Sequence, residues 1–332
     1  MKTENGYLLI SLDFELFWGL FDVKTKSDYK KNLLNVRKVI PRLVALAGDY
    51  QITLTFATVG LLFAKNKNDL LAALPSDKPT YLNSQFNPYN LIDNLGEDEV
   101  DDPYHYAESL IEFINKNGNH EIASHTFSHY YVNEEGQTPK QFEADIMAAI
   151  TVAKQKNITI KSIVFPRNQI NEAYLKICAK HDIICYRGIE KHWMFDTHDT
   201  KKLDNTAHKA FRLLDAYCNV SGYNTNSLSS LKNCYGDVNI PSSKFFRPYN
   251  KTFKFLEPLR INRIKKGLTQ AAVKNEIYHI WWHPHNFGNN MDENFKNLED
   301  IFKHFKVLKD SHNFQSVSMS ELAEIYLSKE SR

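Results

Sequence analysis

Two histidines, His125 and His129, stand four residues apart in the run from Glu121 to His129. In a helical turn this spacing puts both imidazoles on one face, where they can bind a single metal ion. The residues just before them, 121–124, are typical of a short strand. The pair is therefore expected at the carboxyl end of a strand, where parallel α/β folds collect their active sites.

Two carboxylates end a second apolar run far upstream. The run 7–12 is typical of a parallel strand covered on both faces, and Asp13 and Glu15 follow it. Carboxylates are rarely buried unless they are paired or bind a cation. Residues two apart in extended backbone point to the same side, so both carboxylates can face the histidine pair.

Two further strand-like runs end in basic or imidazole side chains. The run 277–282 ends at His283, and Pro284 and His285 follow it. The run 163–165 is followed by Pro166 and Arg167. Four strand ends thus carry, in chain order, Asp and Glu, two His, Arg, and His.

Strand-like and helix-like segments alternate along the chain, as in a parallel barrel or an open parallel sheet. One poorly periodic stretch, about 62–103, contains four prolines and predicts an inserted lid or cap beside the site. A second stretch, about 188–267, is rich in Asn, Ser and Lys and predicts long loops. We expect one catalytic domain over residues 1–332.

These motifs resemble those of the polysaccharide deacetylases, the NodB-like carbohydrate esterases of family 4. The segment His125-Thr126-Phe127-Ser128-His129 matches the second motif of that family, and His283-Pro284 matches the last one. The segment Asp13-Phe14-Glu15 matches an Asp-x-Glu variant of the first motif. The resemblance implies an incomplete, distorted (β/α)7 barrel.

The resemblance also implies roles for these residues. Glu15, His125 and His129 would bind the metal, Asp13 would be the general base, and His283 the general acid. Arg167 would hold the Asp13 carboxylate by charge-assisted hydrogen bonds. Two alternatives stay open: Asp13 and Glu15 can exchange roles, and His285 competes with His283 as the acid.

Other residues are candidate substrate contacts: Trp18, Trp282, His285 and Arg247. Arg247 belongs to the segment Arg247-Pro248-Tyr249, which is similar to the family's third motif. This segment falls too late in the chain, so the order of the motifs favours Arg167 as the arginine of the third motif. The family's fourth motif, Asp-x-x-x-Trp, has no clear counterpart, and Trp193 and Asp215 are the candidates.

One divalent ion fits the chemistry that these residues indicate. It would polarise an amide carbonyl and lower the pKa of its bound water from about 15.7 toward about 7. Zinc is the expected ion, and two imidazoles with one carboxylate also accept cobalt, iron, nickel or manganese.

Composition fits a globular enzyme. Hydrophobic residues make up 42% of the 332 residues, and aromatic residues, at 13%, suit a cleft that stacks on sugars. The formal charge of +2 and the lack of a basic stripe give nucleic-acid or anionic-membrane binding no electrostatic support. The four cysteines have no metal-binding spacing, and no run is long and apolar enough for membrane insertion. The start of the sequence lacks the features of a signal peptide, which predicts a cytoplasmic protein.

Three functions follow from this pattern. The first is removal of N-acetyl groups from an acetamido sugar in a cell-surface glycan or its nucleotide-linked or lipid-linked precursor. The second is hydrolysis of another carbon–nitrogen bond, as in a cyclic imide or amide. The third is glycan binding by a non-catalytic relative. The sequence specifies neither the sugar nor the oligomeric state.

Overall fold

The structure is a computed structural model that describes residues 5–190 and 206–330. Over these ranges it contains one mixed sheet of eleven strands. The strands are β1 (Tyr7–Phe14), β2 (Thr55–Thr58), β3 (Glu121–Ser124), β4 (Ser162–Ile163), β5 (Cys185–Gly188), β6 (Asn226–Ser227), β7 (Lys232–Cys234), β8 (Asp237–Pro241), β9 (Lys244–Phe245), β10 (Glu276–Trp282) and β11 (Gln315–Ser316).

Seven neighbouring strands of this sheet run parallel, in the order β10, β1, β2, β3, β4, β5 and β8. The chain just after β8 then reaches the other side of the curled sheet, because β9 pairs with β10. Only two residue pairs make this connection, so the ring is distorted and incomplete. The predicted α/β fold with an incomplete (β/α)7 barrel is confirmed.

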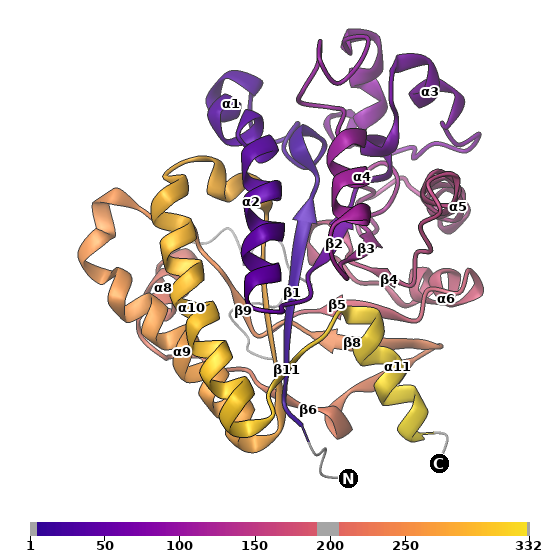
Figure 1. Cartoon of the computed structure of the whole chain (residues 1–332). Helices are drawn as coiled ribbons and strands as arrows, with labels where there is room; N and C mark the ends of the chain where they lie inside the picture. The colour runs from indigo at the N-terminus through magenta and orange to yellow at the C-terminus, as the bar shows by residue number, and fades with distance from the viewer. Residues whose placement is uncertain (1–4, 191–205, 331–332) are drawn as a thin grey trace.

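Helices cover the outside of the sheet (Figure 1). The α-helices are α1 (Lys26–Leu34), α2 (Val36–Asp49), α3 (Lys67–Ala72), α4 (Glu108–Lys116), α5 (Pro139–Gln155), α6 (Glu172–Lys180), α8 (Thr206–Tyr217), α9 (Glu257–Lys274), α10 (Met291–His312) and α11 (Met319–Glu330). Short 3-10 helices are η1 (Leu16–Gly19), η2 (Gly60–Phe63), η3 (Ser84–Phe86), η4 (Pro88–Asn94), η5 (Pro166–Asn168), η7 (Leu228–Ser230), η8 (Lys251–Leu256) and η9 (Pro284–Gly288). Among the helices described, none is both long and apolar enough to cross a bilayer.

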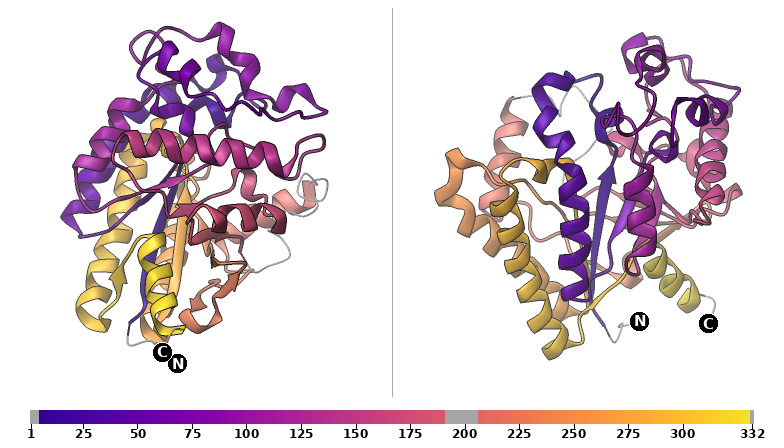
Figure 2. Two further views of the ribbon diagram at one scale, coloured as in Figure 1. Left: turned by 90° about the vertical axis from the view of Figure 1, so that its right-hand side faces the viewer. Right: turned by 45° about the horizontal axis from the view of Figure 1, so that its top comes forward.

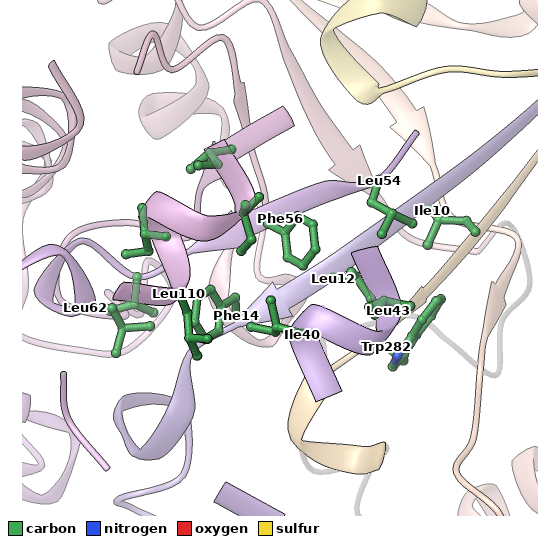
Figure 3. Close-up of a cluster of buried hydrophobic side chains, with 14 of the residues drawn as sticks. Ile10, Leu12, Phe14, Ile40, Leu43, Leu54, Phe56, Leu62, Leu110 and Trp282 are labelled. Carbon is green, nitrogen blue, oxygen red and sulfur yellow. The ribbon is translucent and has the colours of Figure 1, made fainter. Parts of the chain in front are cut away.

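Strand β1 shows how the barrel separates its core from its site. Leu12 and its even-numbered neighbours face outward, where they pack with residues such as Leu43 and Phe56 beneath the helices (Figure 3). Leu9 faces inward and joins a second apolar cluster that includes Leu322 of α11. Further along the strand the inward residues become polar, beginning with Ser11. Because side chains alternate along a strand, the polar cluster lies inside the barrel toward the carboxyl ends of the strands.

The predicted cap, residues 62–103, contains α3 and the two short 3-10 helices η3 and η4, and lies at the end of the molecule toward which β1 points (Figures 1 and 2). Tyr81 accepts a hydrogen bond from the Tyr131 backbone at 2.8 Å, and the Phe86 ring lies 5.6 Å from the Tyr131 ring. The segment therefore packs beside the histidine motif, and its action as a lid stays a prediction. The loop-rich segment, 188–267, holds more regular structure than expected, including α8 and β8. Its residues 191–205 lie outside the described ranges.

Asp237, at the start of β8, is fully buried, and neither of its carboxylate oxygens has a hydrogen-bond partner. Burial raises its pKa to about 8. An unfolded Asp has a pKa of about 3.9. Between these values the unfolded chain binds fewer protons than the folded one, so stability falls as the pH rises. We expect Asp237→Asn to reduce the loss of unfolding free energy between pH 5 and pH 8 by about 1–3 kcal/mol.

Urea denaturation at the two pH values measures this effect. The matched control is Asp310→Asn, at an exposed aspartate of α10. A pH dependence in Asp237→Asn that equals those of the wild type and the control would contradict the prediction.

Candidate metal centre and active site

Three buried side chains converge at the carboxyl ends of β1 and β3. The Oε2 atom of Glu15 lies 3.3 Å from Nε2 of His125 and 3.2 Å from Nε2 of His129. Among the described residues, this is the group of three His, Cys, Asp or Glu side chains whose ligand atoms lie close enough together to share one ion. Gly19 has no Cβ, and the Glu15 carboxylate occupies the space where one would lie.

The tautomer of His125 is compatible with a cation between these groups. Its Nδ1 lies 2.7 Å from the Val164 carbonyl oxygen, which only accepts hydrogen bonds, so Nδ1 carries a proton. The neutral ring then directs the lone pair of Nε2 at the Glu15 carboxylate, an unfavourable contact unless a cation or a second proton intervenes. Burial also lowers the pKa of His129, which favours the neutral imidazole that metals bind. Both observations fit a divalent ion held by Glu15, His125 and His129.

The loop that carries the two histidines is not the helical turn that their spacing suggested. Thr126 and His129 have left-handed backbone conformations, with φ of 63° and 58°. A β-branched residue such as Thr rarely adopts this region, and such strain gathers at functional sites. The buried carboxylate of Asp145 in α5 holds the loop by accepting hydrogen bonds from the backbone N–H groups of Phe127, at 2.6 Å, and Ser128, at 3.1 Å, and from the Ser128 hydroxyl.

Asp145 was not recognised from the sequence, although a signal was present. It lies among the apolar residues at helical spacing in α5, one position before Ile146, where an ordinary amphipathic helix buries only apolar side chains. A carboxylate at such a position needs a polar partner, and the partner here is the histidine loop.

Asp13 is held by an arginine that the sequence analysis missed. Arg187, at the end of β5, donates from Nη1 to Oδ1 at 2.6 Å and from Nη2 to Oδ2 at 2.8 Å. Arg187 also donates to Ser11 and to Asn168. Burial alone would raise the pKa of Asp13, but the adjacent Arg187 guanidinium holds that pKa below its usual value. Asp13 is therefore a rigidly oriented, ionised carboxylate beside the three-residue cluster.

The expected contact between Arg167 and Asp13 is wrong. Arg167 forms an ion pair with Asp22 instead and lies 3.5 Å from Glu134. Its guanidinium stacks over the ring of Tyr131 at 4.2 Å. The physical reason is the short turn after β4, in which Arg167 has a left-handed backbone with φ of 55°. This turn directs the side chain to the rim of the site, and the next parallel strand supplies the arginine that reaches Asp13.

His283 completes the group around Asp13 and Glu15. Its Nε2 lies 3.7 Å from Oδ2 of Asp13 and 3.6 Å from Oε1 of Glu15, and its side chain is 24% exposed. His285 is buried behind it, with the two rings stacked at 4.9 Å. Burial, and then the charge of His283, lower the pKa of His285 to about 3. His285 therefore has the position of a support for His283, which corrects its expected role as a substrate contact.

The two tryptophans expected to bind substrate belong to the core instead. Trp18 is fully buried, and its indole N–H donates to the His105 carbonyl oxygen at 2.9 Å. Trp282 is fully buried among apolar residues on the outer side of β10 (Figure 3). Its neighbour Trp281 points into the barrel, because alternate residues of a strand face opposite sides. The Trp281 ring stacks on the Arg187 guanidinium at 4.2 Å and lies 5.8 Å from the His283 ring.

Three candidates from the sequence remain: Arg247, Asp215 and Trp193. Arg247 follows β9, and its pKa is lowered by burial and by the neighbouring charge of Arg212. Its contact with substrate stays a prediction. Asp215 is buried in an ion pair with Lys244 at 2.6 Å, and Trp193 lies outside the described residues.

Comparisons with known proteins agree with the fold. The sequence model of the family described as polysaccharide deacetylase matches residues 28–185, a range that contains His125 and His129 but neither Asp13 nor His283. The match covers a little under half of the chain and agrees with the resemblance that the motifs indicated. The Asp-x-Glu form of the first motif stays a prediction. No curated protein sequence matches the chain.

Several solved structures share the fold at low sequence identity. A Mycobacterium smegmatis protein, provisionally described as a polysaccharide deacetylase, is 12% identical over 98% of this chain and 91% of its own, with a TM-score of 0.60. A Pseudomonas aeruginosa PAO1 protein described in similar terms is 10% identical over 96% and 89%, with a TM-score of 0.50. The 4-alpha-glucanotransferase from Thermococcus litoralis is 11% identical over 98% of this chain and 40% of its own, with a TM-score of 0.52. At these identities the likenesses show the fold alone.

Proposed function

We propose that this protein is a metal-dependent hydrolase that removes N-acetyl groups from an acetamido sugar. The substrate is a cell-surface glycan or its nucleotide-linked or lipid-linked precursor. One observation carries the proposal: two imidazole Nε2 atoms and a Glu15 oxygen converge within 4.8 Å of one another. Beside them lie an ionised Asp13 and a partly exposed His283.

A divalent ion, zinc in the first instance, would bind Glu15, His125 and His129. When bound there, it supplies a Lewis acid that polarises an amide carbonyl and activates water at neutral pH. The geometry supports Glu15 rather than Asp13 as the carboxylate ligand, because Arg187 occupies both Asp13 oxygens.

The protein's own residues would move the protons. Asp13 would accept a proton from the attacking water as the water oxygen bonds to the acetyl carbon. His283 would donate a proton to the amide nitrogen when the carbon–nitrogen bond breaks. The products are acetate and a free amino sugar. The stacked ring of His285 limits rotation of His283, so the donor nitrogen stays directed at the site.

Trp281 is the aromatic side chain best placed to contact a sugar. Its ring is only partly buried, and it packs against Phe245 at 4.7 Å and next to His283. Aromatic rings present an apolar face to the C–H face of a sugar ring while leaving the sugar hydroxyls free for hydrogen bonds. The cytoplasmic location expected from the sequence stays a prediction.

Acetate release tests the proposal directly. Zinc- or cobalt-loaded protein is incubated with free, nucleotide-linked and lipid-linked N-acetylhexosamines, and we expect acetate from at least one. Removal of the metal by a chelator should abolish release, and added metal should restore it. Turnover of a cyclic imide without acetate release from any sugar would contradict the proposal in favour of another carbon–nitrogen hydrolase. A metal-loaded protein that binds glycans but hydrolyses none would identify a non-catalytic binding protein.

A further inference from the structure

The positive charge of the chain is concentrated in one part of the sequence. Residues 206–274 contain twelve Lys and Arg residues against three carboxylates, an excess of nine positive charges. Since the whole chain carries +2, the other residues carry an excess of seven negative charges. The small net charge of the whole chain conceals this uneven distribution of charge between its parts. The expectation that electrostatics give no support to binding of an anionic surface is therefore wrong for this segment.

Burial makes the surface of this segment still more positive, because all three of its carboxylates lie inside the protein. Asp237 is fully buried, and Asp215 and Glu257 each pair with buried cations. The surface of the segment therefore presents no carboxylate of its own. Lys251 and Lys254 of η8 are exposed there, with Arg212 and Arg247 partly exposed.

Large apolar side chains are exposed in the same region. Phe255 of η8 is 71% exposed, and Leu259, in the first turn of α9, is 50% exposed. On α8, Phe211 and Leu214 lie three residues apart on the outer face and are exposed by 47% and 49%. We call these four residues, with Lys251 and Lys254, the α8–η8 surface.

The α8–η8 surface is one region of the fold. Helix α8 packs against α9, and the Tyr217 ring at its end lies 6.3 Å from the Phe253 ring of η8. Figure 1 shows α8 and α9 on the same side of the barrel. Apolar and cationic side chains are thus combined on a single flank.

We propose that the α8–η8 surface docks peripherally on an anionic lipid bilayer. Exposed Phe and Leu side chains partition into the headgroup boundary, and Lys side chains bind anionic headgroups. A second copy of the chain is a poor occupant, because its matching surface is also cationic and offers no carboxylate for pairing. The phosphates of a nucleic acid would pair with the lysines, but Phe255 and Leu214 would stay exposed to water.

The position of this surface relates it to the candidate site. Phe245 of β9 lies 6.2 Å from the His283 ring, and the chain continues from Phe245 through Arg247 directly into η8. Docking would therefore bring the mouth of the site near the bilayer, where a lipid-linked sugar resides. This consequence rests on the proposed function, whereas docking itself does not.

Vesicle sedimentation with the full-length protein tests the docking and requires no enzymatic activity. We expect binding to vesicles of mixed phosphatidylcholine and phosphatidylglycerol that is at least tenfold stronger than binding to phosphatidylcholine alone, and that weakens in high salt. Phe255→Ser with Leu214→Ser, and separately Lys251→Glu with Lys254→Glu, should each reduce binding at least tenfold. All four positions are exposed, so the fold should be retained.

Matched controls replace exposed side chains elsewhere. Leu82→Ser with Val100→Ser removes two residues of the cap that are 75% and 92% exposed, and Lys38→Glu with Lys306→Glu alters two exposed lysines of α2 and α10. Equal loss of binding in the controls would overturn the proposal. So would equal binding to both kinds of vesicle, or a wild-type dimer that Phe255→Ser disrupts while no vesicle binds. Binding to RNA but to neither kind of vesicle would overturn it in favour of a nucleic-acid surface.

Discussion

Replacing Asp13 by Asn is expected to lower kcat by about 10²–10⁴-fold and to leave the metal in place. Asparagine matches the shape of aspartate but cannot accept a proton from water. Both Asp13 oxygens contact Arg187, and Asp13 is not one of the three converging ligand groups. The measurement is kcat for acetate release, with metal content determined on the same preparation.

The fold needs a control of its own, because Asn leaves the Arg187 guanidinium buried without its counter-ion. Breaking such a pair costs about 3–5 kcal/mol. The double variant Asp13→Asn/Arg187→Met removes both charges and should recover much of that stability, whereas turnover stays lost. If Asp13→Asn loses the metal and Glu15→Gln keeps it, the two carboxylates have exchanged roles.

The positions of the main chemical groups could be predicted because they follow the ends of apolar strands. Parallel strands place their carboxyl ends at one edge of a sheet, so residues far apart in sequence meet there. His125 follows β3, His283 follows β10, and Glu15 follows β1, and the structure brings all three together. The alternation of strand-like and helix-like segments predicted a parallel barrel or an open sheet, and the resemblance to the deacetylases supplied the expected number of seven strands.

Details that depend on a single residue of register could not be predicted. Trp281 and Trp282 are adjacent in β10 and therefore face opposite sides of the sheet. Only the register of the strand decides which of the two faces the site. Arg167 and Arg187 both lie near the carboxyl ends of short strands, and the left-handed turn at Arg167 directs that side chain away from Asp13. Sequence periodicity over strands as short as β4, with two residues, does not determine these choices.

Removing both imidazoles is expected to abolish metal binding. His125→Ala/His129→Ala leaves Glu15 as a single ligand, and one carboxylate does not hold a divalent transition metal at micromolar concentration against water. The substitutions also relieve the contact of two imidazole nitrogens with the Glu15 carboxylate, so the variant is expected to fold. Circular dichroism and the thermal midpoint check that expectation.

The matched control for this variant is His304→Ala/His312→Ala. It removes two imidazoles from α10, outside the converging group. If this control loses metal together with His125→Ala/His129→Ala, the loss reflects the histidine content and not the site.

Elemental analysis of the three purified proteins, after exposure to zinc or cobalt and desalting, shows whether Glu15, His125 and His129 hold a metal ion. We expect about one divalent ion per chain in the wild type and the control, and none in His125→Ala/His129→Ala. A wild type that retains no metal under these conditions, or a His125→Ala/His129→Ala variant that retains as much as the wild type, would contradict this expectation.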